Sequence, residues 1–199
     1  MVDFRKKHTE RCKDCKIAFA HLLRAAYGDV AENYSLDLPA DLASYRDSPA
    51  FRTMSLIHKD LGAFRGYKEF VRTKKLAPVD YFIPSRRIVV EFDESQHFTA
   101  QRAIALRRYP RTLRLGFNVD AWIALCESLD KTDADPVYRP EQRAWYDVLR
   151  DFASVHADVR KTVRVHAPTM KWCDVDPDNP TGLRSFKSVL KGRTRQALS

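Results

Sequence analysis

Apolar residues recur at helical spacing over residues 12–27, which predicts an amphipathic helix that ends near Gly28. The recurring positions are Ile17, Ala20, Leu23 and Ala26. The same periodicity predicts three further helices, over residues 99–109, 119–129 and 140–156.

Shorter runs show the composition and alternation of β-strands. Residues 31–38 and 159–166 each predict one strand. The run from Val79 to Glu94 holds two β-rich segments on either side of Pro84–Arg87, which predicts a β-hairpin.

The length of 199 residues favours one domain with additions. We expect a single domain over residues 1–170, which carries a helical insertion at about 40–75. A Pro-, Gly- and charge-rich basic arm is expected over residues 171–199. The helical pattern of the insertion is interrupted at Pro49, Gly62 and Gly66.

The predicted hairpin carries an unusual set of carboxylates. Alternation along a strand places Glu91 and Asp93 on one face, although the apolar run at 88–90 indicates an interior strand. A symmetric turn centred on Ser85–Arg86 puts Asp80 directly opposite Glu91. The same register pairs Ile83 with Ile88, Phe82 with Val89, and Tyr81 with Val90.

Like charges at opposed strand positions are destabilising unless something compensates them. A divalent cation such as Mg²⁺ between Asp80 and Glu91 would do so, because it prefers carboxylate and water oxygens. The alternative is an exposed edge hairpin whose acids are neutralised by Arg86 or Arg87.

The charge balance points to an anionic partner. The net charge is +9, with 35 Lys and Arg against 26 Asp and Glu, and nucleic acid is the commonest partner for such a chain. No run is long and apolar enough to cross a bilayer, and Met1–Lys16 has no apolar signal segment. We therefore expect a cytoplasmic protein with no membrane association and with reduced cysteines.

The segment VDYFIPSRRIVVEFDESQHF resembles the core of the PD-(D/E)XK nuclease superfamily. It is most similar to the branch that includes very-short-patch-repair endonucleases, which often shows V-D-F/Y, a short turn and E-x-D-G-x-x-H. The matching residues here are Val79-Asp80-Tyr81 and the run from Glu91 to His97, with Pro78 as a displaced counterpart of the proline.

The resemblance implies an α/β, restriction-endonuclease-like fold: a central mixed β-sheet flanked by helices. It also implies Mg²⁺-dependent hydrolysis of phosphodiester bonds, with Mn²⁺ as a substitute and duplex DNA as the expected substrate. Asp80 would be the central metal ligand, Glu91 the second, and the Phe92 backbone carbonyl would complete the shell.

The chain departs from the family pattern in three places. Asp93 stands where the family has a lysine, which leaves the group that activates water open between Asp93, Gln96 and His97. Glu94 replaces the usual glycine. The first helix carries no glutamate, and only Glu10 precedes it.

Several cationic residues are expected to contact DNA phosphates. These are Lys74, Lys75, Arg86, Arg102, Arg107 and Arg108. A homodimer is a further expectation, because duplex cutters often act in pairs.

Cys12 and Cys15 form a CxxC pair close to His8 and His21. This spacing suits zinc, but the second half of a standard pattern is missing, since Cys126 and Cys173 stand alone. A redox pair and ordinary buried cysteines are the alternatives.

The sequence thus favours a Mg²⁺-dependent DNA endonuclease of a restriction, repair or mobile-element type. The alternative is a non-catalytic nucleic-acid-binding module that keeps the nuclease fold, which the missing lysine and glutamate favour. A structural subunit of a defence or repair complex is a third hypothesis.

Overall fold

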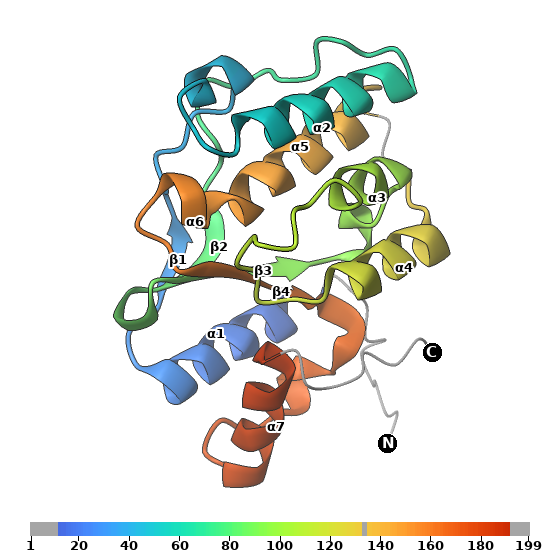
Figure 1. Cartoon of the computed structure of the whole chain (residues 1–199). Helices are drawn as coiled ribbons and strands as arrows, with labels where there is room; N and C mark the ends of the chain where they lie inside the picture. The colour runs from blue at the N-terminus through green and yellow to red at the C-terminus, as the bar shows by residue number, and fades with distance from the viewer. Residues whose placement is uncertain (1–11, 133–134, 192–199) are drawn as a thin grey trace.

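The computed structural model describes residues 12–132 and 135–191. Its centre is a four-stranded sheet in the order β1-β2-β3-β4 (Figure 1). The strands are β1 (Ala31–Tyr34), β2 (Val79–Ile83), β3 (Ile88–Asp93) and β4 (Lys161–His166). β1, β2 and β3 pair antiparallel, whereas β3 and β4 pair parallel. The expected α/β class with a mixed sheet is confirmed at this level.

Seven α-helices flank the sheet in the described part of the chain. They are α1 (Lys13–Tyr27), α2 (Phe51–Phe64), α3 (Ala100–Leu106), α4 (Val119–Leu129), α5 (Arg139–Asp151), α6 (Ala153–His156) and α7 (Pro180–Leu190). Helices α3 to α6 lie between β3 and β4 in the chain, as a parallel strand pair requires a long crossover.

Alternating residues of the strands feed two separate cores. Val90 and Phe92 pack with Phe19 of α1 and with α7 on one face of the sheet. Phe82 and Val89 pack with α2 and α5 on the other face. The two layers lie below and above the sheet in Figure 1, with α1 and α7 on the same side. Because the hairpin is covered on both faces, Glu91 and Asp93 lie inside the protein, as the apolar strand indicated.

The predicted hairpin register is confirmed for the pairs Ile83–Ile88, Phe82–Val89 and Tyr81–Val90. Arg87 takes a left-handed conformation at the turn, with φ of 52°. The paired register between these two strands ends at Tyr81–Val90, one position before Asp80 would face Glu91.

Some element boundaries differ from the sequence prediction. The helical pattern over 40–75 yields α2 only to Phe64, because Gly66 has φ of 83° and the chain leaves the helix there. The predicted helix over 140–156 divides at Phe152 into α5 and α6.

The C-terminal segment, expected as an arm, is packed through α7. Phe186, Val189 and Leu190 are buried in the α1 core. Residues 192–199 of this segment lie outside the described residues. Among the helices that the structure describes, none is both long enough and apolar enough to cross a bilayer.

Candidate active site

Asp80 lies where strands β2 and β3 separate. Its Oδ2 accepts a hydrogen bond from the backbone N–H of Phe92 at 2.9 Å. Its Oδ1 accepts one from Lys16 Nζ, on α1, at 2.7 Å. The Asp80 side chain keeps 22% of its surface exposed, so this carboxylate forms the solvent-facing side of the site.

Glu91 is the buried partner of Asp80. Only 4% of the residue is exposed, and Oε1 has no hydrogen-bond partner. Arg150 forms an ion pair with Glu91: its Nε lies 3.5 Å from Oε1, which is too long for a good hydrogen bond. Burial raises the pKa of Glu91 to about 8, against the opposing charge of Arg150, and the negative charge of Asp80 raises it further.

Asp93 forms an ion pair with an arginine of the neighbouring strand β4. Arg164 on β4 donates from Nη1 to both Asp93 carboxylate oxygens, at 2.8 and 3.0 Å. Trp122 Nε1 donates to Asp93 Oδ2 at 3.1 Å. The residue is 1% exposed. Asp93 is therefore a neutralised structural anion in this arrangement, and it is not positioned as the water-activating group that the sequence suggested.

Arg164 joins Asp93 to a larger buried network. It also contacts Asp147 Oδ1 at 3.0 Å and Asp151 Oδ1 at 2.7 Å, both on α5. Arg102 in turn contacts Asp151 and the hydroxyl of Tyr109. Arg102 is 1% exposed, which corrects its predicted role as a DNA contact: its charge is used inside the protein.

His97 contacts the same network, away from the Asp80 side. Its Nδ1 lies 3.1 Å from Asp147 Oδ2 and 3.7 Å from Asp93 Oδ1. Burial lowers the pKa of His97, but the charge and hydrogen bond of Asp147, together with the charge of Asp93, outweigh burial, so the pKa is raised overall. Gln96 donates to Glu94 Oε2 at 3.2 Å, and its carbonyl accepts from Arg143. Both residues thus have partners within the protein.

Two cations that the sequence did not single out lie beside Asp80 and Glu91. Burial lowers the pKa of Lys16, but the neighbouring Asp80 carboxylate raises it, and the pKa lies above its ordinary value. Lys16 therefore stays charged. Arg150 reaches Glu91 from α5 and also lies 3.6 Å from Asp147 Oδ1. Neither belongs to a local motif, since each meets the hairpin only when its helix packs on the sheet. Glu10 and His8 lie outside the described residues.

The remaining predicted DNA contacts have different environments. Lys75, Arg107 and Arg108 form surface pairs with Asp37, Glu127 and Asp60 respectively. Lys74 is exposed. Arg86 lines a pocket at the turn end of the hairpin.

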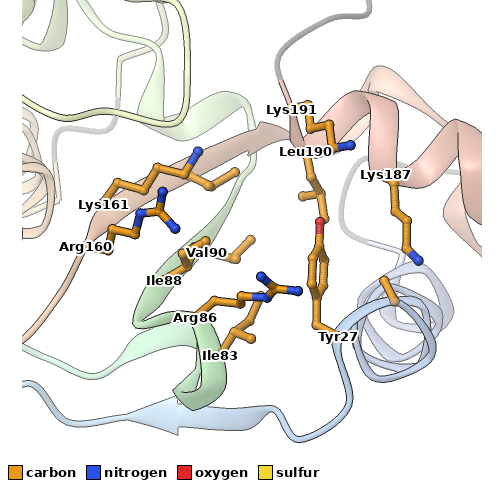
Figure 2. A pocket seen from close by; sticks show the side chains of 12 residues that line it. Tyr27, Ile83, Arg86, Ile88, Val90, Arg160, Lys161, Lys187, Leu190 and Lys191 are labelled. Carbon is orange, nitrogen blue, oxygen red and sulfur yellow. The ribbon is translucent and has the colours of Figure 1, made fainter.

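This pocket, of about 470 Å³, is strongly cationic (Figure 2). Tyr27 from the end of α1 forms one side, and Ile83, Ile88 and Val90 lie deeper. Five cationic side chains surround it, and none forms an ion pair with the described residues: Arg86, Arg160, Lys161, Lys187 and Lys191. Unpaired cations gathered around one cavity favour an anionic ligand.

The residues at the hairpin offer hard oxygen ligands for Mg²⁺. Asp80 and Glu91 supply two carboxylates, and Oε1 of Glu91 is a buried acceptor that forms no hydrogen bond, although Arg150 lies 3.5 Å away. Phe92 donates its N–H toward β2, and the carbonyl of a strand residue faces the same neighbour as its N–H. These three groups are of the chemical kind that Mg²⁺ prefers, whereas the Asp93 carboxylate is already paired with Arg164.

Comparison with known proteins identified no relatives: no family model, no curated protein and no solved structure matches the chain.

Proposed function

We propose that the protein is a Mg²⁺-dependent nuclease that hydrolyses phosphodiester bonds in DNA, with Asp80 and Glu91 as the metal ligands. One observation carries the proposal. Glu91 is a 4% exposed carboxylate whose Oε1 forms no hydrogen bond and has Arg150 Nε at 3.5 Å as its ion-pair partner, and the charge of Asp80 acts on it as well. A buried carboxylate oxygen that forms no hydrogen bond costs stability, and its presence next to a second acid supports a cation-binding role.

The site residues divide the chemistry between them. A bound Mg²⁺ would polarise the phosphate and lower the pKa of an attacking water. Asp80, at the exposed side of the site, and Glu91, which is buried, would hold the ion. Lys16 and Arg150 supply positive charge beside the carboxylates, where it offsets the charge of the transition state.

The cationic pocket supplies a binding site for the DNA backbone. Helix α1 connects the two regions, since Lys16 lies near Asp80 and Tyr27 lines the pocket. At 1.5 Å per residue, Lys16 and Tyr27 are about 16 Å apart along the helix. This separation corresponds to roughly five base pairs of duplex at 3.4 Å each. The pocket lies on the α1 face of the sheet, whereas Glu91 faces α5, so we propose the two regions as separate contacts with DNA.

A non-catalytic nucleic-acid-binding protein is the second candidate, and a specific observation favours it. Lys16 already forms an ion pair with Asp80 Oδ1, and Arg164 neutralises Asp93. A chain that had lost metal binding would keep its acids paired in this way, while the pocket would still bind phosphates.

Cleavage assays with matched variants separate the two candidates. The full chain is incubated with supercoiled plasmid, linear duplex and single strands, in Mg²⁺, Mn²⁺ or EDTA. We expect metal-dependent cutting that is lost in Asp80→Asn and Glu91→Gln. Asp158→Asn and Glu127→Gln, which alter exposed surface pairs, should cut normally.

Two outcomes contradict the nuclease proposal. Cutting that survives both site variants would place the activity elsewhere. Binding to DNA without cutting of any substrate would favour the second candidate.

A further inference from the structure

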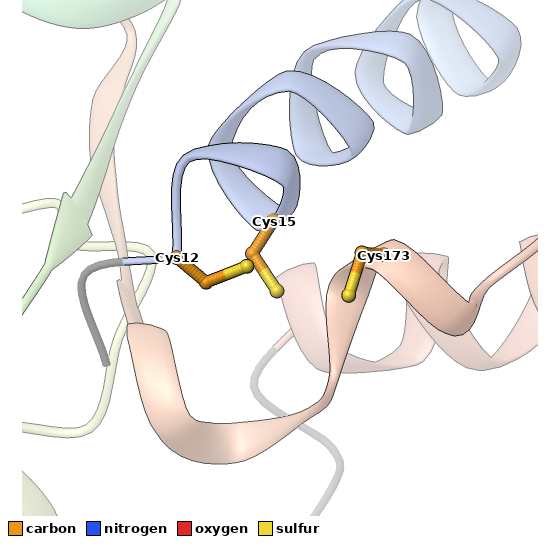
Figure 3. A group of neighbouring side chains, drawn as sticks. All are labelled: Cys12, Cys15 and Cys173. Carbon is orange, nitrogen blue, oxygen red and sulfur yellow. The ribbon is translucent and has the colours of Figure 1, made fainter. Parts of the chain in front are cut away.

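Three cysteines converge at the end of α1 opposite the cationic pocket. Cys12 immediately precedes the helix, Cys15 lies in its first turn, and Cys173 belongs to the short helical turn Trp172–Asp174 (Figure 3). Their three sulfur atoms all lie within 4.8 Å of one another. No other group of three or more His, Cys, Asp or Glu ligands converges in this way among the described residues.

No sequence motif joins Cys173 to the CxxC pair, because Cys173 lies near the opposite end of the chain. Packing brings it there. Trp172, the neighbour of Cys173, is fully buried and packs edge-on against Phe19 of α1, with ring centroids 5.0 Å apart. The third sulfur is therefore held at the CxxC pair by the core itself.

We propose that Cys12, Cys15 and Cys173 bind one zinc ion through their thiolates. Zinc–sulfur bonds of about 2.3 Å in a tetrahedron set sulfur atoms about 3.8 Å apart. Small rotations of the cysteine side chains bring the sulfurs from their present spacing to this value. This inference is independent of the nuclease proposal, because it concerns a different set of ligands and a softer metal.

The fourth position of the ion faces solvent. Cys15 is 3% exposed, whereas Cys173 is an exposed residue, so zinc enters from the Cys173 side. Asp174 Oδ1 lies 3.8 Å from Cys173 Sγ and provides a nearby carboxylate, with water as the alternative fourth ligand.

The site would tie the start of α1 to the segment that leads into α7. Lys16, which contacts Asp80, directly follows Cys15 in the chain. Zinc would thus fix the helix end that presents Lys16 to the carboxylates, and its removal would loosen the core around Phe19 and Trp172. The expected role is structural, and its readouts are metal content and stability.

The test uses the full chain, expressed and purified under reducing conditions without chelators. We expect about one zinc per chain by elemental analysis, and a thiolate-to-metal charge-transfer absorption after replacement with Co²⁺. Cys12→Ala, Cys15→Ala and Cys173→Ala should each weaken zinc binding at least 100-fold in competition with a chromophoric chelator. Cys126→Ala is the matched control, because Cys126 is buried in α4, outside the cluster.

Stability provides the second readout. A chelator should lower the unfolding temperature of the parent chain and of Cys126→Ala, and leave that of Cys173→Ala unchanged. Cys12 and Cys173 are not buried, so their variants keep the test valid even if Cys15→Ala fails to fold. Three results overturn the proposal: absence of stoichiometric zinc with no cobalt–thiolate absorption, full zinc binding by the Cys173→Ala variant, or a Cys12–Cys15 disulfide that persists in the reducing buffer.

Discussion

Arg164 and Asp93 lie on adjacent parallel strands, and Arg164 Nη1 contacts both oxygens of the Asp93 carboxylate, at 2.8 and 3.0 Å. In the strand register Asp93 pairs with His166, two residues beyond the Glu91–Arg164 pair. The guanidinium thus reaches along the sheet to Asp93 while its remaining nitrogens contact Asp147 and Asp151 on α5. Arg164 thus neutralises one carboxylate of the sheet and two of helix α5, and these ion pairs hold α5 against the sheet.

Substitution of Arg164 should therefore be severe. Arg164→Met leaves three buried carboxylates without their shared cation, and removal of one partner of a buried pair costs about 3–5 kcal/mol. Denaturant unfolding followed by circular dichroism measures the loss. Arg87→Met, which breaks an exposed pair with Asp158, should cost about 1 kcal/mol or less. Equal losses in the two variants would contradict the structural role of the network.

Lys16 should matter for cleavage more than for folding. Its side chain is 49% exposed, so Lys16→Met should leave the unfolding free energy almost unchanged. Loss of a charge next to the reacting phosphate should lower the cleavage rate about 100-fold. Lys13→Met, on an exposed part of the same helix, is the control. A Lys16→Met variant that cuts at the parental rate would remove Lys16 from the site.

His97 should make stability depend on pH. Its pKa is raised above the ordinary value of 6.5, because the charge and hydrogen bond of Asp147, together with the charge of Asp93, outweigh burial. Protonated His97 therefore stabilises the fold at low pH, and this stabilisation is lost as the pH rises through the folded-state pKa. The difference in unfolding free energy between the parent chain and His97→Gln should shrink from about pH 6 to pH 9. A constant difference across this range would show that the His97–Asp147 contact does not depend on charge.

The sequence was most informative where local pattern determines structure. Three hairpin pairs follow from alternation and a symmetric turn, and the bounds of α4 match the predicted range 119–129. The position of Asp80 and Glu91 at one hairpin follows from the same register. That inference needs only contacts between residues close together in the chain.

What the sequence did not predict depends on distant packing. Arg164 forms its ion pair with Asp93 only because β4 pairs parallel to β3. Arg102 is buried only because α3 packs on α5. Likewise, Lys16 reaches Asp80 and Cys173 reaches Cys15 only after α1 docks on the sheet. Charged residues on an amphipathic helix look alike in sequence, whether they face solvent or a buried partner.

The cationic pocket should govern the affinity for nucleic acid and its dependence on salt. Arg86 and Lys187 line the pocket and form no ion pair with the described residues, so both are available to phosphates. Arg86→Ala and Lys187→Ala should weaken duplex binding, and each lost phosphate contact should reduce the slope of log affinity against log salt by about 1. Fluorescence anisotropy with a labelled duplex, at several salt concentrations and in EDTA, measures both quantities without cleavage.

The control for the pocket is Arg107→Ala. Arg107 has the same charge, but its guanidinium is already paired with Glu127 on the surface. This variant should bind almost as the parent chain does, with nearly the same salt slope. If Arg107→Ala reduced binding as much as Arg86→Ala, the affinity would come from overall positive charge, and the pocket would have no special role. If the pocket variants weakened binding but left the salt slope unchanged, their side chains would act through the fold and would not contact phosphates directly.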